Sequence, residues 1–243
     1  MTTTAAPATT SASSTRATGA RRSFLDGATA MGPWLVAVVP FGLVIGVTVG
    51  ASSVDPLAGL ATGVTIYSGS AQLAAVELLD QGAAPAVAIA AVLAINSRLV
   101  FYSGAMAVHW QGTSRFFRAL SSYLLVDPSY AVGKSRYLEE PAPRSHAYYL
   151  GGAVTLWMAW QCAILAGFVA GAGVPSALHL EYAVPLFLVA EVVNHARTRP
   201  SVAAAAVGAA VAVAGSSLPF HSGPLAGIAC GIVAAYAMDR WSR

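Results

Sequence analysis

Charged side chains are scarce in this chain. Aspartate, glutamate, lysine and arginine make up only 9% of the 243 residues, whereas hydrophobic residues make up 56% and the mean hydropathy is +0.65. A soluble domain carries roughly 25% charged residues. So few charges cannot cover a water-facing surface, which excludes an ordinary soluble domain and makes lipid the expected solvent for most of the chain.

The usual marks of metal, disulfide and nucleotide chemistry are also missing. The two cysteines, Cys162 and Cys230, lie far apart inside apolar runs, where free thiols behave as small hydrophobes. There is no CxxC or His/Cys cluster and no GxxxxGK[ST] loop. Ser68 and Ser70 have no intramembrane histidine placed to act as a base. We therefore expect no enzyme, no metal and no cofactor, and any uphill transport would use an ion gradient.

The net charge of +3 does not indicate nucleic-acid binding. No basic stripe is interleaved with aromatic residues, and the basic residues lie at the ends of apolar runs instead. The tryptophans, Trp160 among them, also fall mostly near segment ends, as aromatic belts do. This distribution is typical of a membrane protein with a lipid bilayer as its partner.

What the chain does contain is a series of long apolar runs. Most reach the roughly 17–25 residues that a helix needs to cross the hydrocarbon. The sequence therefore predicts an all-α, polytopic transmembrane helix bundle of about six to eight segments in one domain, residues 29–243, preceded by a disordered basic cytoplasmic tail, residues 1–28. The runs cover residues 33–51, 57–79, 83–109, 116–133, 147–173, 181–196, 201–215 and 223–239.

Two of these runs contain helix-breaking residues, Ser68-Gly69-Ser70 and Asp127-Pro128. If both runs are broken helices that re-enter on the same side, Arg115 and Arg118 lie inside with the other basic loops, and both termini are cytoplasmic. If all eight runs cross instead, the loop with these two arginines lies outside, against the usual trend. The sequence leaves both topologies open.

Arg98 is the residue most indicative of function. It lies near the middle of the third run, where a charge is costly and normally faces the bundle interior or a water-filled cavity. It could bind a substrate carboxylate bidentately, or serve as a structural tether to a buried acid or to helix-end carbonyls. Asn96 and Tyr102, two and four residues away, could complete a polar face.

Asp127 and the stretch Ser68-Gly69-Ser70-Ala71-Gln72 are the other candidate site residues. Asp127 could carry a proton or meet a substrate ammonium group, or it could be an N-cap or half of a structural salt bridge. A half-helix beginning near Gly69 would aim free N–H groups and its positive dipole end at an anion. Discontinuous transporter helices bind carboxylates in this way. A small-residue packing seam would explain the same composition.

Four stretches carry a pattern of motifs: VPFGLVIGV at 39–47, YSGSAQLA at 67–74, NSRLVFYS at 96–103 and LVDPSYA at 125–131. Taken together, they resemble the AzlC family, the large subunits of branched-chain amino acid exporters. Their order and spacing agree over about residues 35–135, and the GSAQ and NxR segments are the more specific pair.

The resemblance implies export of branched-chain or similar small amino acids across a prokaryotic cytoplasmic membrane, together with a small AzlD-type membrane subunit. A channel-like pore and a non-transporting assembly subunit are the alternatives. The chain departs from the family pattern at Leu99, where the family has histidine. It also has Val126 and Pro128 on either side of the aspartate, in place of threonine and an acid. These departures bear on substrate identity and proton coupling.

Overall fold

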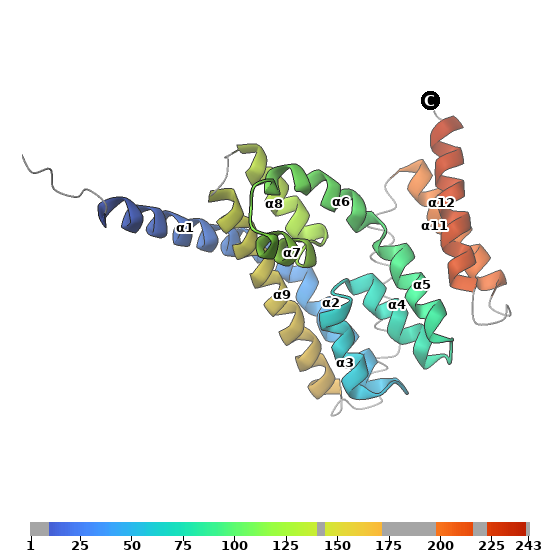
Figure 1. Ribbon diagram of the computed structural model, residues 1–243. Helices are drawn as coiled ribbons and strands as arrows, with labels where there is room; N and C mark the ends of the chain where they lie inside the picture. The colour runs from blue at the N-terminus through green and yellow to red at the C-terminus, as the bar shows by residue number, and fades with distance from the viewer. Residues whose placement is uncertain (1–9, 140–143, 172–197, 216–222, 242–243) are drawn as a thin grey trace, which may run out of the picture. The chain divides into compact units, whose positions relative to one another are not determined.

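The computed structural model describes residues 10–139, 144–171, 198–215 and 223–241, and every regular element in these ranges is a helix (Figure 1). This confirms the all-α prediction for the described part of the chain. The helices are α1 (Thr10–Ala30), α2 (Gly32–Ala51), α3 (Pro56–Thr65), α4 (Gly69–Asp80), α5 (Pro85–Asn96), α6 (Arg98–Ala107), η1 (Val108–Trp110), α7 (Arg115–Tyr123), α8 (Asp127–Glu139), α9 (Arg144–Gly171), α11 (Arg199–Ala214) and α12 (Gly223–Trp241).

Two described helices are long and apolar enough to cross a membrane by themselves. They are α2, with 20 residues, and α9, with 28 residues. The pair α5 and α6, extended to Trp110, would be a third if the bent pair is one span. The count of six to eight segments thus stays a prediction, and the run at 181–196 lies outside the described residues.

Both expected helix breaks are present. Helix α3 ends at Thr65 and α4 begins at Gly69, while α7 ends at Tyr123 and α8 begins at Asp127. Tyr67 has a φ of 39°, which is incompatible with a continuing right-handed helix. Whether these broken pairs re-enter or cross the membrane stays a prediction.

The third run is not the continuous helix that its hydropathy suggested. It bends by 45° between α5 and α6, at Ser97. The Ser97 hydroxyl and its N–H both donate to the carbonyl of Ala94, a side-chain bond that competes with the regular helical ladder and bends helices. Arg98 is therefore the first residue of α6, directly after a bend, and not the middle of a straight span.

The amino-terminal segment also differs from the expected disordered tail over residues 1–28. Helix α1 begins at Thr10, and residues 1–9 lie outside the described residues. A Cβ at Gly27 would overlap the carbonyl of Tyr148, and one at Gly151 would overlap the carbonyl of Phe24. Small residues therefore let α1 and α9 approach backbone to backbone, which orders the end of α1.

Contacts divide the chain into two compact units. Unit 1 consists of Met1–Val38 and Leu99–Ala159, and unit 2 consists of Val39–Arg98 and Trp160–Arg243. Helices α2 and α9 are each divided between the two units. Unit 1 contains α1, α7, α8 and nearly all of α6, whereas unit 2 contains α3, α4, α5, α11 and α12.

In unit 2, α2 and α9 pack through a seam of small residues. A Cβ at Gly46 would overlap the carbonyl of Ile164, and a Cβ at Gly167 would overlap the carbonyl of Leu43. Gly42 faces the Ala163 methyl in the same seam. Such close approach is how apolar helices associate in lipid, where burial of apolar surface gives little driving force.

The remaining helices of unit 2 extend from this seam. Gly59 of α3 lies against Val49 of α2. Leu78 at the end of α4 and Ala91 of α5 belong to one buried cluster, and Leu225 of α12 packs against it. Helices α11 and α12 approach each other closely where Gly208 meets Gly227. The interrupted helix α3–α4 therefore lies in a packed surrounding that includes both α2 and α9.

Candidate functional site

The amino-terminal end of α4 provides the first half of the candidate site. Its N-cap, Ser68, has an extended backbone and makes no side-chain capping hydrogen bond. The N–H groups of Gly69, Ser70 and Ala71 have no partners within the helix, because the first turn has no preceding carbonyls. The Gln72 N–H already donates to the Ser68 carbonyl at 2.7 Å. The predicted stretch 68–72 thus forms a true helix start with a positive dipole end.

Two glutamine side chains donate hydrogen bonds to α3 close to the break. Gln72 Nε2 donates to Thr62 Oγ1 at 3.0 Å, which links α4 back to α3. Gln161 Nε2 on α9 donates to the Gly63 carbonyl at 2.8 Å, near the end of α3. Both amides lie close to Gly63, which leaves room for them because it has no side chain. Exposed backbone at membrane depth needs such partners, and here the protein supplies them.

Two buried polar atoms at this break have no hydrogen-bond partner. Gln72 is 0% exposed and Trp160 is 4% exposed, yet Gln72 Oε1 and Trp160 Nε1 are both unpaired. Buried polar atoms are nearly always paired, since an unpaired one carries a desolvation penalty of about 1–3 kcal/mol. One atom is an acceptor and the other a donor. Trp160 is not among the residues that the sequence singles out, because only the tertiary contacts place it against α4.

Aromatic rings surround the start of α4. A Cβ at Gly69 would overlap the ring of Phe41 and would lie 3.0 Å from Trp160 Cη2. The two rings are edge to face, with centroids 5.6 Å apart. Only glycine fits at this first helical position, so the backbone of α4 lies directly against an apolar wall formed by α2 and α9.

Asn96 and Arg98 lie on either side of the bend at Ser97. Both side chains are half-buried, and Asn96 Oδ1 is buried without a partner. Arg98 is the last residue of unit 2 and the first residue of α6. The bend interrupts the regular backbone next to the only arginine of the apolar third run, which is the setting expected for a charge that does not face lipid.

In unit 1, Tyr102 and Asp127 form a direct pair. The Tyr102 hydroxyl donates to Asp127 Oδ1 at 2.9 Å, and the Tyr102 ring stacks on Tyr130 with centroids 4.3 Å apart. Lys134 Nζ in turn donates to the Tyr130 hydroxyl at 3.0 Å. Asp127, Tyr130 and Lys134 share one face of α8 because they are three and four residues apart. This hydrogen bond does not test the roles expected for Asp127. It shows that Tyr102 lies next to Asp127.

Asp127 is the first residue of α8, and the residues that follow it explain why the helix begins there. Pro128 takes the second helical position, where a missing N–H does no harm. The Ser129 hydroxyl donates toward the Leu124 carbonyl at 2.8 Å and accepts from the Val126 N–H at 2.9 Å. The polar groups of the break are thereby satisfied locally, and the Asp127 carboxylate accepts from Tyr102.

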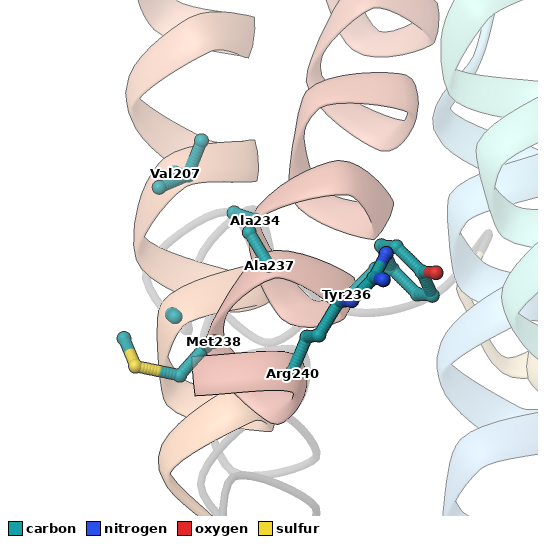
Figure 2. A pocket seen from close by; sticks show the side chains of 7 residues that line it. Val207, Ala234, Tyr236, Ala237, Met238 and Arg240 are labelled. Carbon is teal, nitrogen blue, oxygen red and sulfur yellow. The ribbon is translucent and has the colours of Figure 1, made fainter. Parts of the chain in front are cut away.

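A separate pocket lies on α11 and α12 (Figure 2). It contains none of the predicted site residues. Apart from Arg240, the side chains around it are apolar or aromatic, and it is open. They are Ala203, Val207, Ala234, Tyr236, Ala237, Met238 and Arg240. In the described ranges no group of three or more His, Cys, Asp or Glu side chains gathers in a way that could hold a metal ion.

In the described part of the chain, the fold and the site define a helical membrane protein whose interrupted helices present polar groups among apolar helices. A family model described as "AzlC protein" matches residues 33–174, which spans α2 through α9. The chain belongs to the AzlC family, and this membership supports a membrane transport-related role. Comparisons with the curated proteins and with the solved structures found no match.

Proposed function

We propose that this protein is a secondary transporter that exports branched-chain amino acids, or similar small amino acids, and is driven by an ion gradient. The observation that carries the proposal is the start of α4 inside the break after α3. A helix start with uncapped N–H groups beside apolar walls suits a ligand with one anionic end and one apolar side chain.

In this proposal the substrate carboxylate binds the N–H groups of Gly69, Ser70 and Ala71, and Arg98 provides the positive charge. The rings of Phe41 and Trp160 and the side chain of Ile164, which packs near Gly63, contact the leucine, isoleucine or valine side chain. Ser68, Gln72 and Asn96 supply neutral hydrogen-bonding groups. An apolar pocket with a few polar groups that fix orientation is the usual design of small-molecule sites.

Asp127 carries the coupling proton in this scheme. Its carboxylate accepts a hydrogen bond from the Tyr102 hydroxyl, which holds it in one position on α8. The family pattern places an acid after the aspartate, and Pro128 stands there instead. Asp127 alone would then couple proton movement to transport, whereas two neighbouring acids could share that task.

The family resemblance supports three further parts of the proposal. The protein would act in a prokaryotic cytoplasmic membrane, with both termini cytoplasmic. It would work together with a small AzlD-type membrane subunit. It would catalyse no chemical reaction, because no nucleophile and base are paired in the candidate site.

Counterflow in proteoliposomes tests the function. With the small subunit present, external unlabelled leucine should accelerate the release of labelled leucine from vesicles. Arg98→Ala should weaken apparent leucine affinity by about 10- to 100-fold, because a hydrogen-bonded charge pair contributes about 1.5–3 kcal/mol. Arg118→Ala, at an exposed position on α7, is the matched control and should transport normally.

Three results would contradict the proposal. A gradient that collapses without acceleration by unlabelled leucine would indicate a channel-like pore. Full transport by the small subunit alone would make this chain a non-transporting assembly subunit. Normal leucine affinity in a stably inserted Arg98→Ala protein would remove Arg98 from the site.

A further inference from the structure

Two unpaired polar atoms beside the first turn of α4 need an explanation that the start of α4 alone does not give. Gln72 Oε1 is a hydrogen-bond acceptor and Trp160 Nε1–H is a donor, and both are sealed from solvent. The other end of the Gln72 amide is used, because its Nε2 donates to Thr62. The unpaired carbonyl therefore belongs to a side chain that is already fixed in place.

Gln72 lies in the first turn of α4, and Trp160 of α9 packs against that turn. Trp160 packs against Gly69, the first residue of the helix, and a Cβ there would lie 3.0 Å from its ring. Gln72 is three residues further on, and helical side chains lean toward the amino-terminal end. The unused N–H groups of Gly69, Ser70 and Ala71 therefore lie in the same turn as one unpaired acceptor and beside one indole ring with an unpaired donor.

We propose that Trp160 is a substrate-binding residue and that Gln72 and Trp160 together recognise a zwitterionic α-amino acid. This inference rests on the proposed function. The Gln72 carbonyl accepts from the substrate ammonium group, and the Trp160 N–H donates to the carboxylate beside the N–H groups of α4. A site of neutral hydrogen-bonding groups rejects ligands that lack one of the two ends, because its buried polar atoms are then left unpaired.

The same arrangement explains why the protein keeps two unpaired polar atoms. Such atoms destabilise the substrate-free protein, and binding sites commonly retain groups that reduce stability. In the structure the aromatic rings of Phe41 and Trp160 cover this turn. Binding must then replace some of these ring contacts, and the gain from two newly satisfied polar atoms offsets that loss.

The test uses the purified full-length chain with its small subunit and measures binding and thermal stability of Trp160→Phe. This substitution keeps an aromatic side chain, although a smaller one, and removes the N–H. We expect leucine to bind about tenfold more weakly, so leucine should raise the melting temperature of the variant less than that of the wild-type protein. Trp157→Phe is the matched control. Trp157 lies on the same helix, and its Nε1 already donates to the Tyr123 hydroxyl at 2.9 Å.

A series of leucine analogues tests Gln72 first in the wild-type protein, where misfolding of a variant plays no part, and then in two variants. 4-Methylpentanoate lacks the ammonium group and 3-methylbutylamine lacks the carboxylate, and each should bind at least about tenfold more weakly than leucine. In Gln72→Met the preference for leucine over 4-methylpentanoate should disappear, whereas Trp160→Phe should retain it.

The outcomes separate this inference from the function on which it rests. If wild-type protein binds leucine and Trp160→Phe binds it equally well, with the same rise in melting temperature when leucine is added, the inference is overturned and the exporter proposal stands. If wild-type protein binds 4-methylpentanoate as tightly as leucine, the role of Gln72 is overturned. If wild-type protein binds and transports no amino acid, both the inference and the proposed function are overturned.

Discussion

Tyr102 and Asp127 are 25 residues apart and meet through one hydrogen bond of 2.9 Å. Sequence reasoning nominated both residues, but it assigned Tyr102 to the polar face of Arg98 and not to Asp127. The contact suggests that Tyr102 holds the Asp127 carboxylate in place.

Tyr102→Phe should therefore lower the rate of leucine export by about tenfold, because a hydrogen bond to a charged group contributes about 1.5–3 kcal/mol. Export measured in proteoliposomes checks this. Tyr130→Phe is the control, because the Tyr130 hydroxyl accepts from Lys134 and the substitution keeps the ring that stacks on Tyr102. Normal export by Tyr102→Phe would exclude a role for this hydrogen bond in placing Asp127.

At the scale of elements, the two helices that flank the break, α3 and α4, have different amino-terminal caps. Asp55 caps α3 by accepting from the Ala58 N–H at 2.9 Å, whereas the Ser68 side chain makes no such bond for α4. The uncapped start is the one that carries the proposed carboxylate site. A ligand can take the place of a capping side chain, because both satisfy the same N–H groups.

Asp55→Ala and Ser68→Ala should consequently affect the protein in opposite ways. Loss of the Asp55 cap should lower the free energy of unfolding by about 1 kcal/mol and leave leucine affinity unchanged. Ser68→Ala should leave stability nearly unchanged, because no cap is lost, and should weaken leucine binding if its hydroxyl contacts substrate. Thermal unfolding in detergent and leucine binding, measured on both variants, would show the contrast. A stability loss in Ser68→Ala equal to that in Asp55→Ala would contradict it.

The packing seam between α2 and α9 is a second feature at the scale of elements, and it determines the stability of the protein. Gly46→Ala should destabilise the protein by about 1–3 kcal/mol, because the new methyl would overlap the backbone carbonyl of Ile164. Gly50→Ala, one turn further along the same helix, is the matched control. Its methyl would lie 3.5 Å from Phe168 Cδ2, an ordinary contact. Apparent melting temperatures from size-exclusion chromatography of heated samples should fall for the first variant only.

For the whole molecule, membership of the AzlC family and the apolar helices together support a role in transport across a membrane. The proposed direction is export. An exporter matters most when its substrate accumulates inside the cell, and peptide uptake followed by hydrolysis creates that condition.

Cells that lack this protein should therefore accumulate leucine, isoleucine or valine when fed a peptide rich in these residues. Intracellular amino acid profiling measures the effect, and the amino acid that rises most identifies the substrate. Restoring the wild-type gene should lower the pool, and restoring the Arg98→Ala variant should not. Equal pools in cells with and without the protein would argue against export of these amino acids.

The sequence by itself determined most of the helical framework. The run predicted at 33–51 is α2, Gly32–Ala51, and the run predicted at 223–239 is α12, Gly223–Trp241. Both breaks were also predictable, because glycine, serine and proline act on the backbone of their own segment. The family was recognisable from the same local motifs, GSAQ and NxR, which the family match over residues 33–174 confirms.

Only the tertiary structure decided how these segments meet. It packs α1 against α9 where a disordered tail was expected, bends the third run at Ser97, pairs Tyr102 with Asp127 and places Trp160 at the start of α4. Hydropathy and helix breakers act over a few neighbouring residues, so a single sequence displays them. Close helix packing and buried hydrogen bonds depend on which distant residues share a surface, and no local pattern specifies that.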